Sequence, residues 1–460
     1  ISVATRSDNA FALRRDWPYG GGFFSPPALS LTDIEDMPAS SFQPLPRVRI
    51  AFWAMIAACA FVLLATCSDQ AAAQSRDVDP RIVFDEDRPL SYASIRLMHL
   101  GRGPLDRMLE PISQWLIDLE ECHCGPSVIA YYTQMYQQGS QGGPNNWTIN
   151  QELDAYAEWE IYQSPSLGRG KLYAYFYHIE DNFTGTDTQQ FADAAGSVWL
   201  SNYNDADGVF NALDVLVWEQ SWNDGQFELL IGQMDPGVLF DLNNYAGDDT
   251  GYFFGEPLAT NPVRTFPLAG LGLMLSIKPA EWLEVFGTIG DADPDGRYPD
   301  FKSLGDGRWF YAAEIVLKPE FGEQRGNYRF TGYWIDPTDA NPRGRGLMLS
   351  IDQPVTTDYG LFLRAAQADR RRRELRKFVS AGIVCLAPGG WKNDRAGIGF
   401  VWGQPTNGSL RDQFGLELFY RWQLTARMEL SPDLQLIFSP AKSEDRAMVA
   451  IAGLRLRWTF

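Results

Sequence analysis

The sequence predicts a transmembrane antiparallel β-barrel of about 16 strands, with a short N-terminal helical segment before it. Three observations support this fold class. Apolar and polar residues alternate through many segments of about the length that a tilted membrane strand needs. The connections between these segments alternate between short and long. In the last segment, every even position from Met448 to Phe460 is apolar, while Arg455 and Arg457 occupy odd positions.

The composition narrows the class of protein. The chain has 460 residues, 42 glycines, 13% aromatic residues and a formal charge of -19. Residues 50–65 form one apolar run, and no second run follows, so the chain is not a helical membrane protein, which needs repeated runs of about 18 residues. The acidic balance argues against a nucleic-acid partner, because phosphate binding needs a basic face.

The first 127 residues precede the predicted barrel. Residues 47–73 read as a secretory signal peptide, because two arginines precede an apolar run and small residues end at Ala73, where we place the cleavage. Residues 1–46 look odd before such a signal, and we interpret them as a non-native or mis-called leader. Residues 74–127 read as an N-terminal periplasmic segment that contains an amphipathic helix over 104–121.

Cys122 and Cys124 flank His123 just after this helix. Adjacent residues cannot easily close a tetrahedral metal site alone, so we expect no metal and no cofactor. The role of the helix and of the two cysteines stays open.

Residues 128–460 read as the barrel. The expected strands are 128–137, 147–162, 171–180, 210–222, 226–234, 268–278, 282–290, 309–319, 327–335, 346–354, 359–367, 378–387, 396–403, 414–424, 428–438 and 446–460. Long connections, such as 181–209, 235–267 and 291–308, alternate with short turns, and this asymmetry is typical of outer-membrane barrels.

The alternation predicts which side chains face the lumen. Strand 147–162 has an apolar face with Trp147 and Trp159 near its ends and an acidic face that only water tolerates. We therefore expect a polar lumen with charges of both signs, which the long connection 235–267 could narrow. The candidate solute-pathway residues are Glu152, Asp154, Tyr156, Arg329, Glu417, Arg421, Arg455 and Arg457.

The C-terminal part also resembles a known family. Residues 417–425 read E-L-F-Y-R-W-Q-L-T, residues 431–435 read S-P-D-L-Q and residues 453–456 read G-L-R-L. Together with W-E-Q-S-W at 218–222, these segments are similar to those of OprB-type carbohydrate-selective porins. The resemblance covers most of 128–460 and is most specific in the last sixty residues or so.

The resemblance implies a sixteen-strand outer-membrane porin for the passive diffusion of monosaccharides or small oligosaccharides into the periplasm. Outer-membrane lipid and the transported sugars would be its partners, and homo-oligomerisation stays open. The alternatives are a general or cation-preferring diffusion porin and a secreted glycan-binding β module. We expect no enzyme and no catalytic residues, because two of the three histidines precede the barrel and no serine elbow motif occurs.

Overall fold

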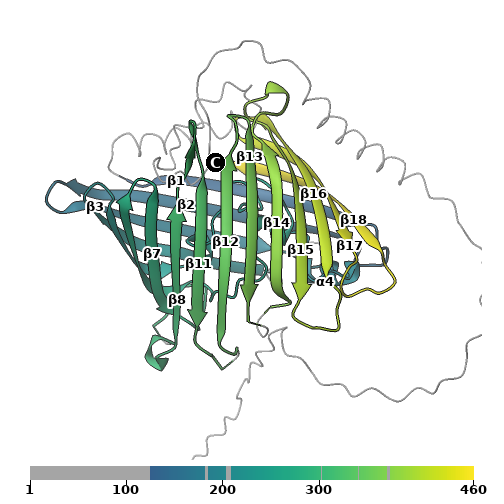
Figure 1. The fold of residues 1–460 in the computed structure, drawn as a ribbon, viewed down its shortest axis with the longest axis horizontal. Coiled ribbons are helices and arrows are strands. Elements are labelled where there is room, and N and C mark those ends of the chain that lie inside the picture. The colour runs from purple at the N-terminus through teal and green to yellow at the C-terminus, as the bar shows by residue number, and fades with distance from the viewer. Residues whose placement is uncertain (1–124, 182–184, 204–208, 302, 340, 370–372) are drawn as a thin grey trace, which may run out of the picture. The chain divides into compact units, whose positions relative to one another are not determined.

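The computed structural model describes residues 125–181, 185–203, 209–301, 303–339, 341–369 and 373–460. Within these residues the chain forms a closed antiparallel barrel of sixteen strands, in which β1 pairs with β18 (Figure 1). The expected leader, the signal peptide and the N-terminal helix lie outside the described residues.

Strands run around the barrel in sequence order. The first half comprises β1 (Ser127–Gly139), β2 (Trp147–Ser164), β3 (Gly168–Glu180), β4 (Val209–Trp222), β5 (Phe227–Met234), β6 (Gly270–Ala280), β7 (Leu283–Asp291) and β8 (Trp309–Leu317). The second half comprises β11 (Asn327–Ile335), β12 (Gly344–Pro354), β13 (Tyr359–Ala368), β14 (Leu375–Cys385), β15 (Arg395–Pro405), β16 (Gln413–Thr425), β17 (Met428–Phe438) and β18 (Met448–Thr459). A separate small hairpin, β9 (Glu320–Phe321) with β10 (Gln324–Arg325), connects β8 to β11.

The sixteen predicted strands are confirmed, and their ends lie within three residues of the prediction. Turn chemistry explains this accuracy in places. Between β4 and β5, Asn223, Asp224 and Gly225 have φ of 51°, 53° and 83°. Asn, Asp and Gly are the residues that adopt positive φ most readily, which suits a tight hairpin.

The connections confirm the expected asymmetry between the two ends of the barrel. Short turns such as 281–282 and 426–427 lie at one end of the barrel, together with the start of β1 and the end of β18. The long connections 181–208 and 235–269 lie at the other end. The moderately long connection 386–394 at the short-turn end contains the 3-10 helix η3 (Pro388–Gly390).

The outward faces of the strands are apolar and exposed. Trp147 and Trp159 mark the two ends of this belt on β2, with exposed fractions of 38% each. A belt of apolar side chains flanked by aromatic residues is what a lipid bilayer requires of a barrel. None of the helices in the described part of the chain is long and apolar enough to cross a membrane.

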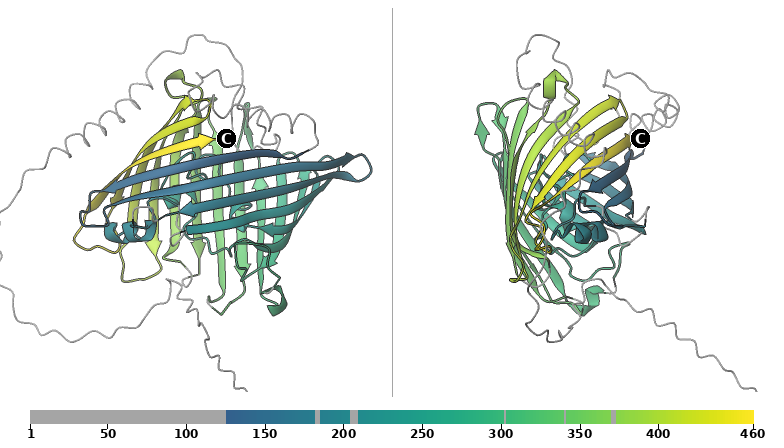
Figure 2. Two further views of the ribbon diagram at one scale, coloured as in Figure 1. Left: turned by 180° about the vertical axis from the view of Figure 1, so that it is seen from behind. Right: turned by 90° about the vertical axis from the view of Figure 1, so that its right-hand side faces the viewer.

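Two long connections fold into the barrel. We call residues 235–269, between β5 and β6, the inner loop; it contains η1 (Pro236–Val238) and α5 (Glu256–Ala259). The connection from β3 to β4 contains α4 (Thr188–Ala195), whose buried Phe191 packs with Val449 and Ile451 of β18. Figure 2 shows these teal segments within the ring of strands.

Hydrogen bonds join the two inner segments to each other. The backbone N–H of Glu256 donates to the Leu200 carbonyl at 3.1 Å, and the Leu200 N–H donates to the Glu256 carboxylate at 3.0 Å. The two segments are therefore joined to each other inside the barrel.

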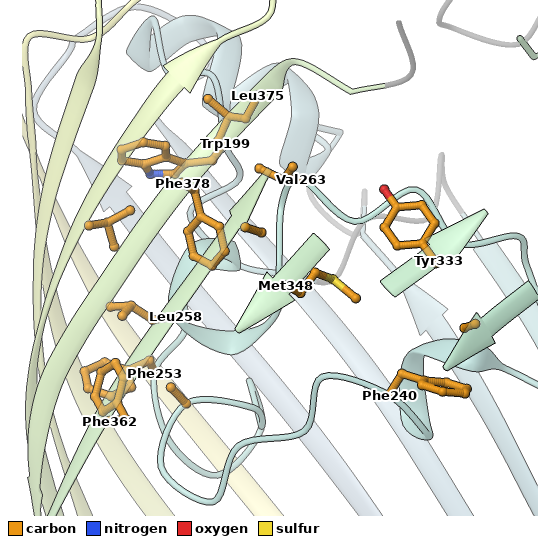
Figure 3. Packing of buried hydrophobic residues seen from close by; sticks show 14 of the residues in the cluster. Trp199, Phe240, Phe253, Leu258, Val263, Tyr333, Met348, Phe362, Leu375 and Phe378 are labelled. Atoms are coloured by element: carbon orange, nitrogen blue, oxygen red, sulfur yellow. The ribbon is translucent and has the colours of Figure 1, made fainter. Parts of the chain in front are cut away.

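The inner loop packs on an apolar part of the lumen wall, which the sequence did not predict. Phe240, Phe253 and Leu258 of the loop join wall residues such as Phe362 and Phe378 in one buried cluster (Figure 3). The expectation of a polar lumen is therefore incomplete. The inner side of the wall from β7 to β16, which we call the seat of the loop, carries buried apolar residues together with buried polar ones such as Glu314 and Arg364.

Glycines on β15 provide the space for this seat. A Cβ at Gly399 would lie 2.7 Å from Cδ1 of Leu258, and one at Gly397 would lie 3.1 Å from Cζ of Phe253. These distances leave room for no atom larger than hydrogen. The inner loop therefore contacts the wall at positions where glycine has no side chain.

Candidate functional site in the barrel lumen

Two arginines of β18 hold the middle of the inner loop. Arg455 is 1% exposed and donates through Nη2 to the carbonyl oxygen of Tyr252 at 3.0 Å and through Nη1 to that of Asp249. Its guanidinium also lies 4.3 Å from the ring centre of Phe254. A buried guanidinium needs such partners, so the loop backbone and β18 stabilise each other.

Arg457 connects the loop to the first strand of the barrel. Its Nε lies 3.0 Å from the Glu429 carboxylate of β17, and its Nη1 lies 3.9 Å from the Asp248 carboxylate of the loop. The same guanidinium covers the Tyr131 ring at 4.7 Å. A guanidinium, two carboxylates and an aromatic ring therefore lie together at this point of the lumen.

Two neighbouring carboxyl groups in the loop differ in pKa. Burial raises the pKa of Asp249 to about 7, and the adjacent Asp248 carboxylate raises it further. Burial acts on Asp248 in the same direction, but Arg457 outweighs it together with the Thr250 hydroxyl, so the pKa of Asp248 is lowered. The loop therefore presents one fixed charge and one carboxyl group that titrates near neutrality.

Glu417 of β16 binds the turn of the inner loop before α5. Its carboxylate accepts from the backbone N–H groups of Phe254 and Gly255, the second at 3.1 Å. Arg421, on the same face of β16, donates to the Gly251 carbonyl at 3.3 Å. These contacts fix the loop between β16 and β18.

A second ionic cluster holds the beginning of the loop on the far wall. Arg364 of β13 is 1% exposed and contacts the Asp241 carboxylate at 2.7 Å. Arg329 of β11 pairs with Glu314 of β8 at 3.0 Å, and Glu314 also accepts from the Asp241 N–H at 2.8 Å. The loop is thus held by charged groups near its beginning and at its middle.

A row of aromatic rings lines the other part of the lumen, on β1 to β4. The ring centres of Tyr156 and Tyr175 lie 4.3 Å apart in a stacked pair, and Tyr131 lies 6.1 Å from Tyr156. The row continues from Tyr175 to Tyr177 at 5.8 Å and from Tyr177 to Phe210 at 5.7 Å. We call these five residues the tyrosine row. It leads from the Arg457 contact to the loop end of β4.

Carboxylates accompany the tyrosine row. The Tyr175 hydroxyl donates to Asp154 at 2.7 Å, and the buried side chains of Glu152 and Asp214 lie on the same wall. At the far end, the guanidinium of Arg297 covers Phe210 at 4.8 Å. Tyr156, Tyr175 and Tyr177 are half-buried, so parts of their rings are open to the lumen.

All eight sequence-predicted site residues lie on the lumen side. The structure brings Glu417, Arg421, Arg455 and Arg457 together around the inner loop. Glu152, Asp154 and Tyr156 lie together on β2, whereas Arg329 belongs to the ionic cluster of the far wall. Their part in solute passage stays a prediction.

Sequence reasoning missed the residues that contact the loop from the apolar wall. Arg364 and Glu314 are buried and central to its attachment. Their strands carry apolar residues on both faces, so alternation gave no reason to select them. Within the part of the chain that the structure describes, no three His, Cys, Asp or Glu side chains gather as a metal site would need.

Residues 335–460 match a family model described as carbohydrate-selective porin, OprB family. This match confirms the resemblance to the OprB family that the sequence suggests. The matched residues begin at the end of β11 and include the Arg364, Glu417, Arg455 and Arg457 positions that hold the inner loop.

The solved structure of Pseudomonas putida OprB at high pH has a similar fold. The TM-score is 0.61 at 15% identity, over 76% of this chain and 97% of that one. An uncharacterised protein of Aquifex aeolicus is 22% identical over 234 residues, which are 50% of this chain and 63% of that protein. Porin AaxA of Chlamydia abortus is 21% identical over 315 residues, 65% of this chain and 68% of AaxA.

The chain thus spans about two thirds of the length of the curated relatives that it matches. The closed barrel is similar in fold to the OprB structure, and residues 335–460 are similar to the family of carbohydrate-selective porins. The exposed apolar belt of the closed barrel does not favour the alternative of a secreted glycan-binding β module.

Proposed function

We propose that this porin passes carbohydrates, either monosaccharides or small oligosaccharides, by diffusion from the outside into the periplasm. The observation that carries the proposal is the tyrosine row with carboxylates beside it. The family description of residues 335–460 supports the same class of solute.

The chemistry of the row suits a sugar ring. The C–H face of a pyranose is apolar and packs on aromatic rings, while its hydroxyl groups donate to carboxylates and accept from tyrosine hydroxyls. Tyr156 and Tyr175 offer a stacked aromatic surface, and Asp154 offers an acceptor at its edge. A sugar can therefore exchange water contacts for protein contacts at several neighbouring positions.

The inner loop makes this contact unavoidable. It occupies the side of the lumen next to β7 to β16, so the path for a solute runs beside the wall that carries the tyrosine row. Contacts along such a path must be weak, because a channel needs a solute to leave as readily as it enters.

A second candidate function is a cation-preferring pore without sugar specificity. Glu152, Asp154, Asp214 and Asp235 lie along the path, and rings of carboxylates favour cations. Burial raises the pKa of Asp235, and the nearby Arg264 opposes that shift. The reversal potential in a salt gradient measures this preference directly.

The experiment is planar-bilayer conductance of the purified chain with glucose and a short glucose oligomer titrated in. We expect steady channels whose current falls saturably as sugar is added. The variant Tyr175→Ala removes a central ring of the row and should weaken the block at least several-fold. Phe176→Ala is the matched control, because Phe176 is the next residue on β3 and points outward.

Channels that ignore sugar but prefer cations would replace the carbohydrate proposal by the second candidate. An equal loss of block in Tyr175→Ala and Phe176→Ala would remove the tyrosine row from the pathway. The eight site residues predicted from the sequence are tested in the same assay, with Arg457 and Asp154 as the first choices.

The location in the cell is part of the proposal. The fold supports an outer-membrane position, and the sequence pattern at 47–73 supports export through a cleaved signal peptide. N-terminal sequencing of the protein from outer membranes tests the expected cleavage after Ala73.

A further inference from the structure

Positive charge on the outward face of the barrel is confined to one place. The structure describes every residue of the sixteen barrel strands, and their only basic residues on the outward face are Arg345 of β12 and Arg376 and Lys377 of β14. Basic residues of other strands, such as Lys171 and Arg455, contact groups in the lumen. The outward face from β1 to β11 therefore carries no arginine or lysine.

Two arginines gather at one tryptophan where β11 ends. Trp334 points outward, because the adjacent Tyr333 is buried in the apolar cluster of the lumen. Arg345 lies opposite Trp334 in the register of β11 and β12, so its side chain points outward as well. The guanidinium of Arg343, in the connection between the two strands, lies 4.8 Å from the centre of the Trp334 ring. Both arginines therefore lie on the outer surface of the barrel.

Two more cations lie nearby on β14. Lys377 points outward, because the next residue, Phe378, packs in the same apolar cluster of the lumen. The Nε of Arg376 donates to the amide oxygen of Gln404 on β15 at 3.0 Å, and Gln404 lies opposite Lys377. Strands β12 to β15 lie side by side (Figure 1). We define the basic patch as Arg343, Arg345, Arg376 and Lys377.

The basic patch lies at one edge of the apolar belt. Trp334 and Trp402, on the outward faces of β11 and β15, lie at the end of the barrel that carries the long connections. Leu347 and Phe400 lie closer to the middle of the belt and are 73% and 57% exposed. Aromatic girdles mark the interfaces of a bilayer. The basic patch therefore lies at the depth of lipid headgroups, with acyl chains beside the apolar residues.

Carboxylates neutralise the basic patch only in part. The Nε of Arg345 lies 3.4 Å from the Asp369 carboxylate, and the two side chains are 65% and 41% exposed. Exposed pairs of this kind contribute little, so another anion can compete for the arginine. In the part of the chain that the structure describes, Arg343 and Lys377 have no carboxylate within ion-pair distance.

The remaining carboxylates near the patch bind other groups. Asp336 and Asp412 accept hydrogen bonds from the indole N–H groups of Trp334 and Trp402, at 3.1 and 3.0 Å. The four cations of the patch therefore lie among three carboxylates. The patch stays positive on a chain whose formal charge is -19, so it is a place where this barrel attracts anions.

We propose that the basic patch binds the phosphate groups of glycolipids in the outer leaflet of the outer membrane. This rests on the proposed orientation, in which the long connections face the outside. A guanidinium presents N–H donors in a planar fork that fits a phosphate, and an ammonium adds a compact charge. The cations at the ends of β12 and β14 offer both kinds of contact on one face.

The position of the patch selects a lipid phosphate over a soluble one. Leu347 and Phe400 lie just below it and expose apolar surface that acyl chains cover. A phosphorylated lipid therefore contacts the barrel with its headgroup and its chains at once, whereas free phosphate gains only the charged contact. Because the patch supplies its own positive charge, binding needs no divalent cation between phosphate and protein.

The test is lipid binding by the purified full chain in mild detergent, followed as added mass by native mass spectrometry. The probes are diphosphoryl lipid A, the same lipid after removal of its phosphates, and inorganic phosphate. All are measured with EDTA present, so that no divalent cation bridges the partners. We expect wild type to bind the diphosphoryl form at least about tenfold more tightly than the dephosphorylated form. An equal concentration of inorganic phosphate should not displace it.

A double variant removes the two cations that lack a carboxylate partner. Arg343→Gln with Lys377→Gln should lower the affinity for diphosphoryl lipid A about tenfold or more, and leave that for the dephosphorylated form unchanged. The matched control is Arg325→Gln with Lys392→Gln, which makes the same changes on exposed residues at the short-turn end of the barrel. The control should bind as wild type does.

Equal affinity of wild type for the two lipid forms would overturn the proposal. So would an equal loss in the two double variants, because it would reflect total charge and not the patch. Binding that requires Mg²⁺, or displacement by an equal concentration of inorganic phosphate, would also overturn it. Each variant is first checked for the folded band in a heat-modifiability gel. Block by sugar should match wild type in both, because no residue of the inner loop or the tyrosine row is altered, so this outcome is independent of the carbohydrate proposal.

Discussion

The two sides of the lumen differ in what their inward residues contact. From β7 to β16, phenylalanines and glycines receive the inner loop, and Arg364 and Arg329 take part in buried ion pairs beneath it. From β1 to β4, half-buried tyrosines and carboxylates face the remaining space. The side chains of the first wall are packed as in a protein core, whereas those of the second wall are partly exposed.

The difference teaches how a wide barrel becomes a narrow channel. Sixteen strands enclose more space than side chains alone can fill, so the chain fills part of it with its own long connections. Because the loop packs on one side of the lumen, the proposed solute path runs along the other side. The following variants test this division, beginning with the largest expected effect.

Removing Arg364 should release the start of the inner loop. Arg364→Leu leaves the Asp241 carboxylate buried without its charge partner, which costs about 3–5 kcal/mol in comparable buried pairs. Single-channel recordings should show a larger or flickering conductance. Gln367→Leu, on the outward face of the same strand, should leave conductance unchanged, and the double variant Arg364→Leu with Asp241→Leu should recover part of the loss.

Filling the seat of the loop should have a smaller effect. Gly399→Val places carbon atoms where Leu258 lies and should cost about 1–3 kcal/mol of loop docking, the usual range for overpacking. The current through single channels should rise less than in Arg364→Leu. Gly408→Val is the control, because a Cβ at Gly408 meets nothing within 4 Å. Unchanged conductance in Gly399→Val would mean that the loop does not depend on this seat.

The pH should modulate loop docking through Asp249. Its pKa in the docked loop is about 7, above that of a free aspartate, so the docked state holds a proton that the undocked state has lost. Docking therefore weakens as the pH rises from about 4 toward and through 7, and conductance should increase in that direction. Burial also raises the pKa of Glu256, so Asp249→Asn should reduce this pH dependence and not abolish it. A slope of opposite sign would contradict the prediction.

Loss of one hydroxyl from the tyrosine row should have the smallest effect. Tyr175→Phe keeps the ring and removes the hydrogen bond to Asp154, worth about 0.5–1.5 kcal/mol net. The sugar concentration that halves the current should rise by less than about tenfold. An effect as large as that of Tyr175→Ala would mean that the hydroxyl, and not the ring, carries recognition.

The barrel could be predicted because its constraints are local. In β2, alternation from Trp147 to Tyr162 separates an apolar face from an acidic one. Lipid accepts only the apolar face, so the acidic face must point to the lumen. The lumen positions of Glu417, Arg455 and Arg457 follow from the same alternation.

The seat of the loop could not be predicted in the same way. In β13, Leu361, Phe362 and Leu363 are all apolar, so the sequence gives no sign that Phe362 points inward. The inner loop finds its place through contacts with residues more than a hundred positions away, such as Asp241 with Arg364. Patterns within a strand carry no information about such partners.

The glycines of β15 also have a consequence for the order in which the molecule assembles. The inner loop follows the fifth of the sixteen barrel strands, yet its seat on β15 and its partners on β16 and β18 are among the last strands of the chain. Contacts this distant in sequence form slowly, since the chain between them must first be organised. The barrel therefore acquires its narrow path only after its C-terminal strands are in place, and a chain stalled before that step has not yet seated its loop.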